Sequence, residues 1–448
     1  MLVVILGAGH RGLHLAKLLI GEKKDITFID SDPEQCDLVS QKLDCMAVNG
    51  SGTDPEVLDE AGCKNADIFI AITNSDEVNL VSCALVSSKF KTPRTIAVIR
   101  SMSYTGSEMN VPLLGVDIIV NPSEEVSKQV YDIIMNGLYQ GAMTFPHTPF
   151  ILCNLSISYD SPLRDMPLSK VRPLIKTPFV LTAIQRGRQT LLPSGSTVLQ
   201  KGDTLALVTF KDQMTEMLGE FDASISTPRH ICLVGAGRIS RYLLSKFSPS
   251  SRKRITVVDI DEAKCEQFSE MYPETLVIKG DITDQSVWDD ESLDDYDLMV
   301  AITDKDELNI IISAYAKRMG IAHTIALVKT NPNYAMLARH LDIDTVISST
   351  ESTVDSLLRY IRGENITSIH SIFGGSIEVA EYKLTATNKL LGQKLKDVPL
   401  AGKVIITGVT DKDKNSILAS GNYTFTEGDT LLVAAPHGRV DYATRLFS

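Results

Sequence analysis

Short apolar segments alternate with amphipathic ones from residue 1 to about residue 138. The apolar segments are rich in β-branched residues, as expected of strands buried on both faces, and read LVVIL, ITFID, MAV, DIFIAI, TIAVI and VDIIV. Helical patterns fill the gaps at 11–21, 33–43 and 76–90, and another follows at about 123–137. Asp32 before Pro33 is typical of a helix start. The pattern predicts a six-stranded, doubly wound parallel sheet.

The pattern changes between residues 150 and 212, where strand-like segments are separated by turn residues. ILCNLSIS, FVLTAIQR and TLALVTF indicate a smaller, β-rich domain. The segment GSTVLQKGDTLALV at 195–208 recurs as GNYTFTEGDTLLVA at 421–434. The smaller domain is therefore also present twice.

The larger domain is repeated at an offset of about 230 residues. VVILGAGHRG at 3–12 matches ICLVGAGRIS at 231–240, and DIFIAITNSDEVNL at 67–80 matches DLMVAITDKDELNI at 297–310. Such self-similarity indicates a tandem duplication. We predict two Rossmann-like parallel-sheet domains, each followed by a small α+β, β-rich domain, with boundaries at 1–138, 140–222, 228–364 and 366–448.

Composition excludes several classes of protein. Without a separate basic segment, a net charge of −12 repels phosphate backbones and argues against a nucleic-acid partner. No apolar run approaches the roughly 20 residues that span a bilayer, and the start of the chain is expected to be a strand rather than a leader peptide. The seven cysteines form no CxxC pair, which favours reduced, buried thiols in the cytoplasm and no metal site.

The first half carries a complete dinucleotide-binding motif. Gly7, Gly9 and Gly12 follow a strand and open a helix, whose N-terminal N–H groups attract phosphates. Asp30 ends the second strand, where an acid accepts hydrogen bonds from an adenosine ribose. The acid disfavours the 2′-phosphate of NADP, whereas NAD, ATP, ADP and AMP all remain open.

The second half repeats the motif with one substitution. Gly235 and Gly237 are retained, Ser240 stands in the third glycine position, and Asp259 supplies the ribose acid. We predict a second nucleotide site, or alternatively a copy retained only for packing.

The tandem pattern GAGxxG…ID…GxxxD…AITxxDExN, each followed by a small domain with GDxL, resembles the RCK regulators of potassium transport, built from KTN and TrkA-C domains. The resemblance covers nearly the whole chain, and AITNSDEVN and AITDKDELN are its most specific parts. It implies a non-enzymatic, cytoplasmic subunit, peripheral at the inner face of the membrane. That subunit would bind NAD(H), ATP or ADP and gate a TrkH-like, potassium-translocating membrane subunit. A homo-oligomer, a tetramer in the family, is also implied. The implied nucleotide contacts are Gly7, Ala8, Gly9, His10, Arg11, Gly12, Asp30, Thr53, Thr73, Asn74 and Arg100, and Gly235, Ala236, Gly237, Arg238, Ile239, Asp259, Asp281, Thr303 and Asp304.

The chain departs from the family after the fifth strand of each large domain. Family members often carry Arg-x-Arg there, whereas this chain has Val98 and Arg100 in the first half and Leu327 and Lys329 in the second. We therefore expect Arg11, in the first glycine loop, and Arg238, in the second, to supply positive charge to the phosphates.

Two other functions compete with regulation. An NAD-dependent oxidoreductase needs a proton-transfer residue and a substrate domain, and the sequence indicates neither. A tandem scaffold that binds no nucleotide is the second alternative. The acids Asp76, Glu77, Asp306 and Glu307 are interpreted as first-turn helix residues rather than metal ligands, and Trp288 as a packing residue.

Overall fold

The computed structural model describes residues 1–448 apart from 91–93, 105–113, 136–141, 158–160, 188, 222–227, 330–333, 335–336, 339–340, 362–365, 374, 401–402 and 448. The chain forms two compact units. One contains Met1–Lys128 and Ile231–Ile361, and the other contains Gln129–His230 and Arg362–Ser448. Like domains are thus brought together from distant parts of the chain.

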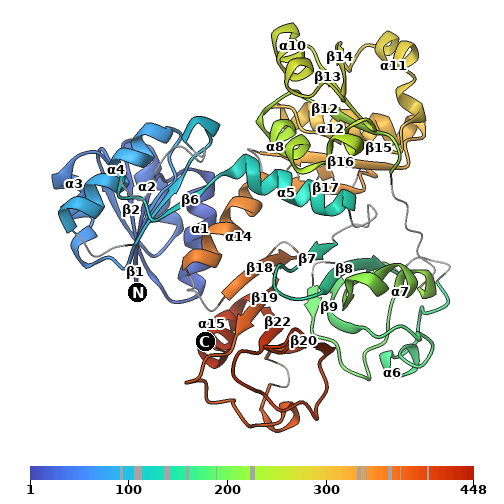
Figure 1. The fold of residues 1–448 in the computed structure, drawn as a ribbon. Coiled ribbons are helices and arrows are strands. Elements are labelled where there is room, and N and C mark those ends of the chain that lie inside the picture. Colours follow the sequence, from blue (N-terminus) through green and yellow to red (C-terminus); the bar gives the residue numbers. More distant parts are fainter. Residues whose placement is uncertain are drawn as a thin grey trace. The chain divides into compact units, whose positions relative to one another are not determined.

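The first unit holds two parallel six-stranded sheets with the same topology (Figure 1). The first has the order β3-β2-β1-β4-β5-β6 and the second β14-β13-β12-β15-β16-β17. Their strands are β1 Leu2–Leu6, β2 Asp25–Asp30, β3 Met46–Asn49, β4 Ile68–Ala71, β5 Arg94–Val98 and β6 Ile118–Val120, then β12 Ile231–Val234, β13 Ile255–Asp259, β14 Leu276–Lys279, β15 Leu298–Ala301, β16 His323–Val328 and β17 Thr345–Ser348. The order reverses direction beside β1 and β12, which places a crevice at their carboxyl ends.

Helices connect these strands, as the amphipathic segments predict. In the first half they are α1 His10–Gly21, α2 Pro33–Lys42, α3 Pro55–Glu60, α4 Asp76–Phe90 and α5 Pro122–Met135. In the second half they are α8 Arg238–Lys246, α9 Pro249–Arg252, α10 Glu262–Met271, α11 Gln285–Glu291, α12 Asp306–Met319 and α14 Ser349–Ile361. Asp32 caps α2 by accepting the N–H of Glu34, which agrees with the helix start predicted at Pro33.

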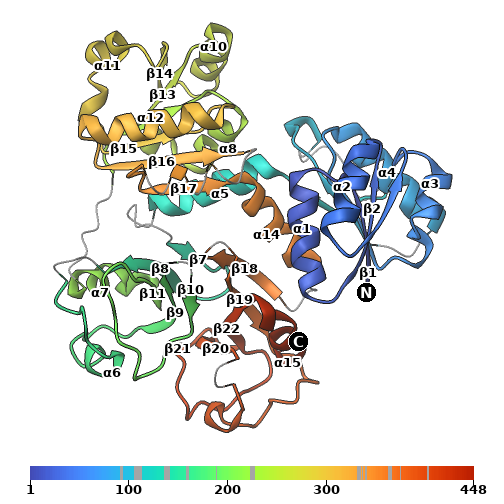
Figure 2. The ribbon, with the colours of Figure 1, turned by 180° about the vertical axis from the view of Figure 1, so that it is seen from behind.

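The last helix of each large domain packs on the other domain. α14 follows β17 of the second sheet but lies against α1 of the first half in both views (Figures 1 and 2). Conversely, Asn121 precedes α5 and donates from Nδ2 to Tyr242 Oη on α8, at 3.0 Å. Arg359 of α14 and Glu125 of α5 form an ion pair at 3.6 Å. The two halves therefore exchange helices and form one body.

Each half keeps its own apolar core beneath this exchange. The first includes Phe69, Val86 and Ile99, and the second includes Trp288, whose indole N–H donates to the carbonyl of Ile282 at 2.8 Å. The packing role predicted for Trp288 is confirmed. All seven cysteines are free thiols, and every one except Cys45 is buried.

The second unit holds two antiparallel five-stranded sheets, ordered β10-β9-β11-β8-β7 and β18-β19-β22-β20-β21. Their strands are β7 Met143–Thr144, β8 Phe150–Ser156, β9 Val180–Arg186, β10 Gln189–Leu191 and β11 Thr204–Phe210, then β18 Ile366–Ile372, β19 Ile377–Lys383, β20 Ile405–Thr410, β21 Ser416–Leu418 and β22 Thr430–Pro436. The helices are α6 Leu168–Val171, α7 Met214–Glu220 and α15 Val440–Phe447. The predicted fold class is confirmed, including the β-rich character of the small domains.

The two small domains share an apolar core. Phe150 and Val208 from one sheet pack with Val379 and Leu432 from the other. A Cβ on Gly408 would lie 2.4 Å from the Phe150 ring, so this close approach requires glycine. The domain joints near 140, 222–227 and 362–365 fall largely outside the described residues, and the four predicted boundaries stay a prediction.

The helices of the described ranges are too short or too polar to cross a bilayer.

Candidate functional site

The two glycine loops connect β1 to α1 and β12 to α8. Gly7 and Gly235 have φ of +112° and +113°, and a Cβ on either would lie only 3.0–3.2 Å from the backbone that follows β4 or β15. Only glycine accommodates that turn. A Cβ on Gly9 or Gly237 would meet no atom within 4 Å, and neither helix start has a side-chain cap. Open space above uncapped helical N–H groups fits a phosphate.

The third position of the motif separates the two halves. A Cβ on Gly12 would lie 2.1 Å from the carbonyl oxygen of Gly7, so this helix packs too closely for a side chain. At the matching position Ser240 is fully buried, and its hydroxyl donates to the carbonyl of Gly235. The serine therefore replaces direct backbone packing with a hydrogen bond.

The acid at the end of the second strand fixes each glycine loop. Asp30 Oδ2 accepts the N–H of Ala8 at 2.7 Å, and its Oδ1 accepts the N–H of Asp32 at 3.0 Å. Asp259 does the same for Ala236, at 2.6 Å, and Asp261, at 2.9 Å. Each carboxylate oxygen has a second lone pair for a ribose hydroxyl. These acids consequently shape the loop as well as facing the ligand space, a role that the sequence did not predict.

The AITxxDExN motif forms a second wall of each site. Asn79 is fully buried, accepts from Thr73 Oγ1 at 2.7 Å and donates to the Val98 carbonyl at 2.8 Å. Asn309 repeats these contacts with Thr303 and Leu327, at 2.7 and 3.0 Å. The asparagine thus ties the turn after the fourth strand to the end of the fifth.

The first acid of this motif does more than begin a helix. Asp76 is buried and accepts the N–H groups of Arg100 and Ser101 at 3.0 and 2.7 Å. Asp306 accepts the N–H of Lys329 at 2.8 Å. The sequence predicts the first-turn position but not this hold on the basic residue after the fifth strand. The sequence signal that could have revealed this contact is the recurrence of the AITxxDExN motif in both copies.

The basic residues after the fifth strands are held differently. The Arg100 guanidinium donates to the carbonyl of Asn74 and lies 3.6 Å from Asp76 Oδ1. Lys329 Nζ forms an ion pair with Asp304 Oδ1 at 2.6 Å. Hydrogen bonding to Lys329 is the largest factor that lowers the pKa of Asp304, although 86% of this side chain is exposed.

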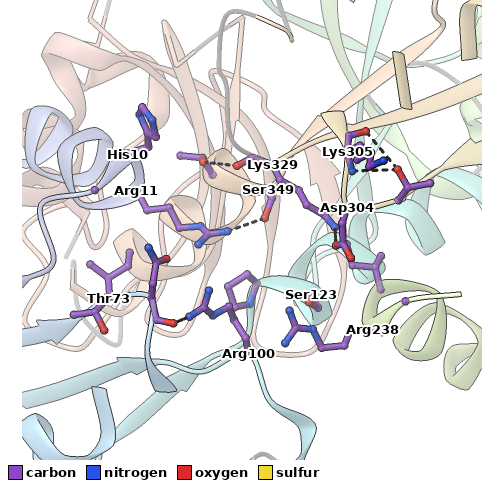
Figure 3. Close-up of a pocket in the computed structure, with 18 of the residues that line it drawn as sticks. His10, Arg11, Thr73, Arg100, Ser123, Arg238, Asp304, Lys305, Lys329 and Ser349 are labelled. Atoms are coloured by element: carbon purple, nitrogen blue, oxygen red, sulfur yellow. Dashed lines mark hydrogen bonds and ion pairs between the residues drawn. The ribbon is translucent and has the colours of Figure 1, made fainter. Parts of the chain in front are cut away.

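One cavity of about 1860 Å³ lies between the two halves of this unit and is lined by both glycine loops. Ligand pockets usually measure about 300–1000 Å³, so this space is large enough for more than one ligand of nucleotide size. In Figure 3 Arg11, Arg100 and Arg238 point into it. Pro122 and Ser123 of α5 and Ser349 and Thr350 of α14 also line it. The sequence did not predict these residues, because they reach the cavity through the helix exchange.

Arg11 connects the halves at the cavity. Its guanidinium donates to Ser349 Oγ at 3.4 Å, while Nε is buried with no hydrogen-bond partner in the described structure. Burial, and then the positive charge of Arg100, lower the pKa of Arg11. A half-buried guanidinium with an unsatisfied Nε, beside a second arginine, favours an anionic ligand.

The cavity brings together the residues predicted for both sites except Ala8, Gly12 and Thr53. Ala8 and Gly12 are buried beneath the loop. Thr53 is exposed and hydrogen-bonds Ser51, whereas Gly50, Ser51 and Gly52 line the cavity beside it. Asp281 accepts from the backbone and the hydroxyl of Thr283 at 2.9 and 2.7 Å, which lowers its pKa.

Comparison with known proteins gives the same domain pattern. The TrkA-N domain family matches residues 3–122 and 231–349, and the TrkA-C domain family matches 155–221 and 379–448. The Trk system potassium uptake protein TrkA of Halomonas elongata is 29% identical over 100% of this chain and 98% of its own length. The protein of the same name from Vibrio alginolyticus is 29% identical over 97% of this chain and 95% of its own length.

Solved structures agree at the level of the fold. The GsuK RCK domain superposes with a TM-score of 0.59 at 16% identity, covering 99% of this chain and 94% of that one. The GsuK channel bound to NAD gives a TM-score of 0.59 at 16% identity over 99% of this chain and 78% of its own. Because the TrkA-N matches alone cover more than half of the sequence, the chain belongs to the TrkA family of tandem TrkA-N and TrkA-C domain proteins.

Proposed function

We propose that this chain is a regulatory subunit that binds NAD(H), ATP or ADP at both glycine loops and gates a potassium-translocating membrane subunit of the TrkH type. The observation that carries the proposal is the pair of matched loops, each with its ribose acid, facing one cavity lined by arginines. The identity of the transported ion, potassium, is inferred from the relatives that are named Trk system potassium uptake proteins.

Each site would hold its nucleotide by the same set of contacts. The N–H groups at the starts of α1 and α8 would bind phosphate oxygens, and Asp30 and Asp259 would accept from ribose hydroxyls. Arg11 and Arg100 would neutralise phosphate charge in the first site. The helix that follows each loop contacts the exchanged segments, since Arg11 of α1 reaches Ser349 at the start of α14 and Tyr242 of α8 bonds Asn121 before α5.

Gating requires that the nucleotide bind two arrangements of the unit with different affinity. A shift from 1:99 to 99:1 needs about 5.5 kcal/mol of differential binding. Two sites in each chain, repeated in an oligomer, would divide this among modest contributions. The exchanged helices α5 and α14 are the elements that would transmit the change, because each belongs to one half and packs on the other.

The remaining features of the proposal follow from the family. The subunit would be a homo-oligomer, a tetramer, placed in the cytoplasm at the inner face of the membrane. Its domains would divide at 1–138, 140–222, 228–364 and 366–448. It would catalyse no reaction, and steady NADH oxidation with small oxo-acids would contradict that.

The test is calorimetric titration of the full chain with NADH, ATP and ADP, alongside Asp30→Asn and Asp259→Asn. A hydrogen bond to a carboxylate contributes about 1.5–3 kcal/mol, so each substitution should weaken its own site by about 10–150-fold. Loss of one site with each variant supports two nucleotide sensors.

The outcomes separate the alternatives. A single site that only Asp30→Asn weakens would make the second half a structural copy. No heat with any of the three nucleotides would contradict the proposal, provided that thermal denaturation shows the chain to be folded.

A further inference from the structure

Positive charge is concentrated at one place in this acidic chain. Residues 223–258 contain seven Lys and Arg and no Asp or Glu, although the whole chain carries a net charge of −12. The net charge alone conceals this run. Arg238 and Arg241 line the nucleotide cavity, and the other five are Arg229, Lys246, Arg252, Lys253 and Arg254.

Four of these five, Lys246, Arg252, Lys253 and Arg254, lie in the first unit at the opposite end of the second sheet from the cavity. Arg254 immediately precedes β13, and the N–H of Ile231, the first residue of β12, donates to the Arg254 carbonyl at 2.9 Å, which places the two strand starts side by side. Lys246 ends α8, and the turn through α9 carries Arg252 and Lys253. We call this group the basic edge.

The side chains of the basic edge differ in how firmly they are held. Arg252 is anchored, since its Nε donates to the Leu244 carbonyl at 2.9 Å and its guanidinium lies 5.0 Å from the Tyr272 ring centre and 3.9 Å from Glu274. Lys253 and Arg254 are exposed and form no ion pair with the described residues. Acids occur farther along this end of the sheet, at Asp297 and Asp344, and Asp344 is paired with Lys317.

The first half provides an internal comparison. Strand register aligns Ile26 with Ile255, so Glu22, Lys23, Lys24 and Asp25 match Ser251, Arg252, Lys253 and Arg254. Two acids and two lysines are replaced by one serine and three cations. The second copy has therefore gained positive charge where the first is balanced.

From this distribution we propose that the basic edge docks on an anionic lipid surface. Protein-binding sites are organised around buried aromatic or aliphatic anchors, whereas the edge offers no exposed large hydrophobic residue within the described part of 229–254. Its exposed groups are cations on flexible stems together with Ser248, Pro249 and Ser250. Charge without an apolar anchor suits a planar anionic membrane, where each Lys or Arg contributes about 1 kcal/mol.

The proposal does not depend on nucleotide sensing, because the edge lies outside the cavity.

The experiment is flotation of the full chain with vesicles of phosphatidylglycerol and phosphatidylcholine, compared with phosphatidylcholine alone. Wild type should bind the anionic vesicles at low salt and dissociate at high salt. Removing two attractive charges in Lys253→Glu/Arg254→Glu should weaken binding by about 30-fold or more.

The matched control is Lys17→Glu/Lys23→Glu, which makes the same change in charge at exposed positions of the first half. It should bind vesicles like the wild type. Thermal denaturation of both variants verifies folding, and nucleotide titration separates this proposal from the function proposed above. Equal binding to both vesicle types, equal loss in both variants, or binding to nucleic acid but not to anionic vesicles would each overturn it.

Discussion

The two nucleotide sites share one topology but distribute charge differently. The first site has Ser51 and Asn74 where the second has the acids Asp281 and Asp304. The second site compensates with Lys305, which adds to the hydrogen bonds from Thr283 in lowering the pKa of Asp281, and with the Lys329–Asp304 ion pair. In the first site Arg100 is paired with Asp76, whereas Arg11 is half-buried with an unpartnered Nε and forms no ion pair with an acid within the described structure.

Because of this difference, we expect the two sites to differ in ligand preference. Cations that are already paired contribute less to binding an incoming phosphate, because the existing pair must first be broken. Unpaired cations in a buried site attract anions more strongly. We therefore expect the first site to prefer the more highly phosphorylated nucleotide and the second to discriminate less.

The largest expected effect comes from exchanging the third motif residue. Gly12→Ser would place a Cβ 2.1 Å from the Gly7 carbonyl oxygen and force the loop to move. Overpacking costs about 1–3 kcal/mol, so we expect that loss of stability together with roughly a 10-fold or greater loss of affinity at the first site. Urea denaturation and nucleotide calorimetry measure the two effects.

The reciprocal variant is Ser240→Gly. It removes the hydrogen bond to the Gly235 carbonyl and should cost about 0.5–1.5 kcal/mol, with affinity at the second site nearly unchanged. If Gly12→Ser were as mild as Ser240→Gly, the two loops would be interchangeable, and the structural distinction between them would be wrong.

Much of this comparison could be predicted from the sequence, because the sheet order follows from alternating apolar segments and the glycine spacing. The sequence also placed Asp30 and Asp259 at strand ends. It did not reveal that each carboxylate holds its own glycine loop. The partner is the backbone N–H of Ala8 or Ala236, and a backbone N–H is present whatever the residue type. The local sequence pattern indicates strands and turns, whereas the hydrogen-bond partners of backbone groups depend on the assembled fold.

The helix exchange could not be predicted for a related reason. The segments at 123–137 and after residue 348 are amphipathic, and amphipathicity shows that a face is buried but not which domain buries it. Ser349 and Ser123 were therefore not predicted to line the cavity. The repeated Asp76 and Asp306 carried more information, since both copies preserve the residue that fixes the following basic position.

The loop arginines are expected to affect nucleotide affinity. Arg11→Ala removes a half-buried cation and should weaken ATP at the first site by about 10–150-fold, the magnitude of a charged hydrogen bond. Arg238 is exposed, so Arg238→Ala should weaken the second site by no more than about 5-fold, as for an exposed ion pair. Calorimetry in the Asp259→Asn and Asp30→Asn backgrounds isolates each site.

The Arg11→Lys variant and the ligand adenosine serve as controls for the titrations of Arg11→Ala and Arg238→Ala. The lysine retains the charge and should restore part of the ATP affinity, whereas adenosine lacks phosphate and should bind all variants equally. Unchanged ATP affinity in Arg11→Ala would show that this guanidinium does not contact phosphate.

The smallest effect concerns the pair of Lys329 and Asp304. Asp304→Asn recreates the residue found at Asn74 and frees the ammonium, so ATP affinity at the second site should rise by up to about 5-fold. Stability should change little at neutral pH, because the Asp304 side chain is largely exposed. Calorimetry in the Asp30→Asn background measures the gain.

The direction of the Asp304 pKa shift determines how the stability should depend on pH. The pKa of Asp304 is lowered in the folded chain, chiefly by Lys329, so the pair contributes above the unfolded pKa and is lost as pH falls through the folded value. An unfolded aspartate titrates near pH 4, so wild type should lose slightly more stability than Asp304→Asn below about that pH. A fall in ATP affinity for Asp304→Asn at neutral pH would instead show that this carboxylate contacts the nucleotide itself. The two sites would then differ in which groups bind the ligand rather than in how their cations are occupied.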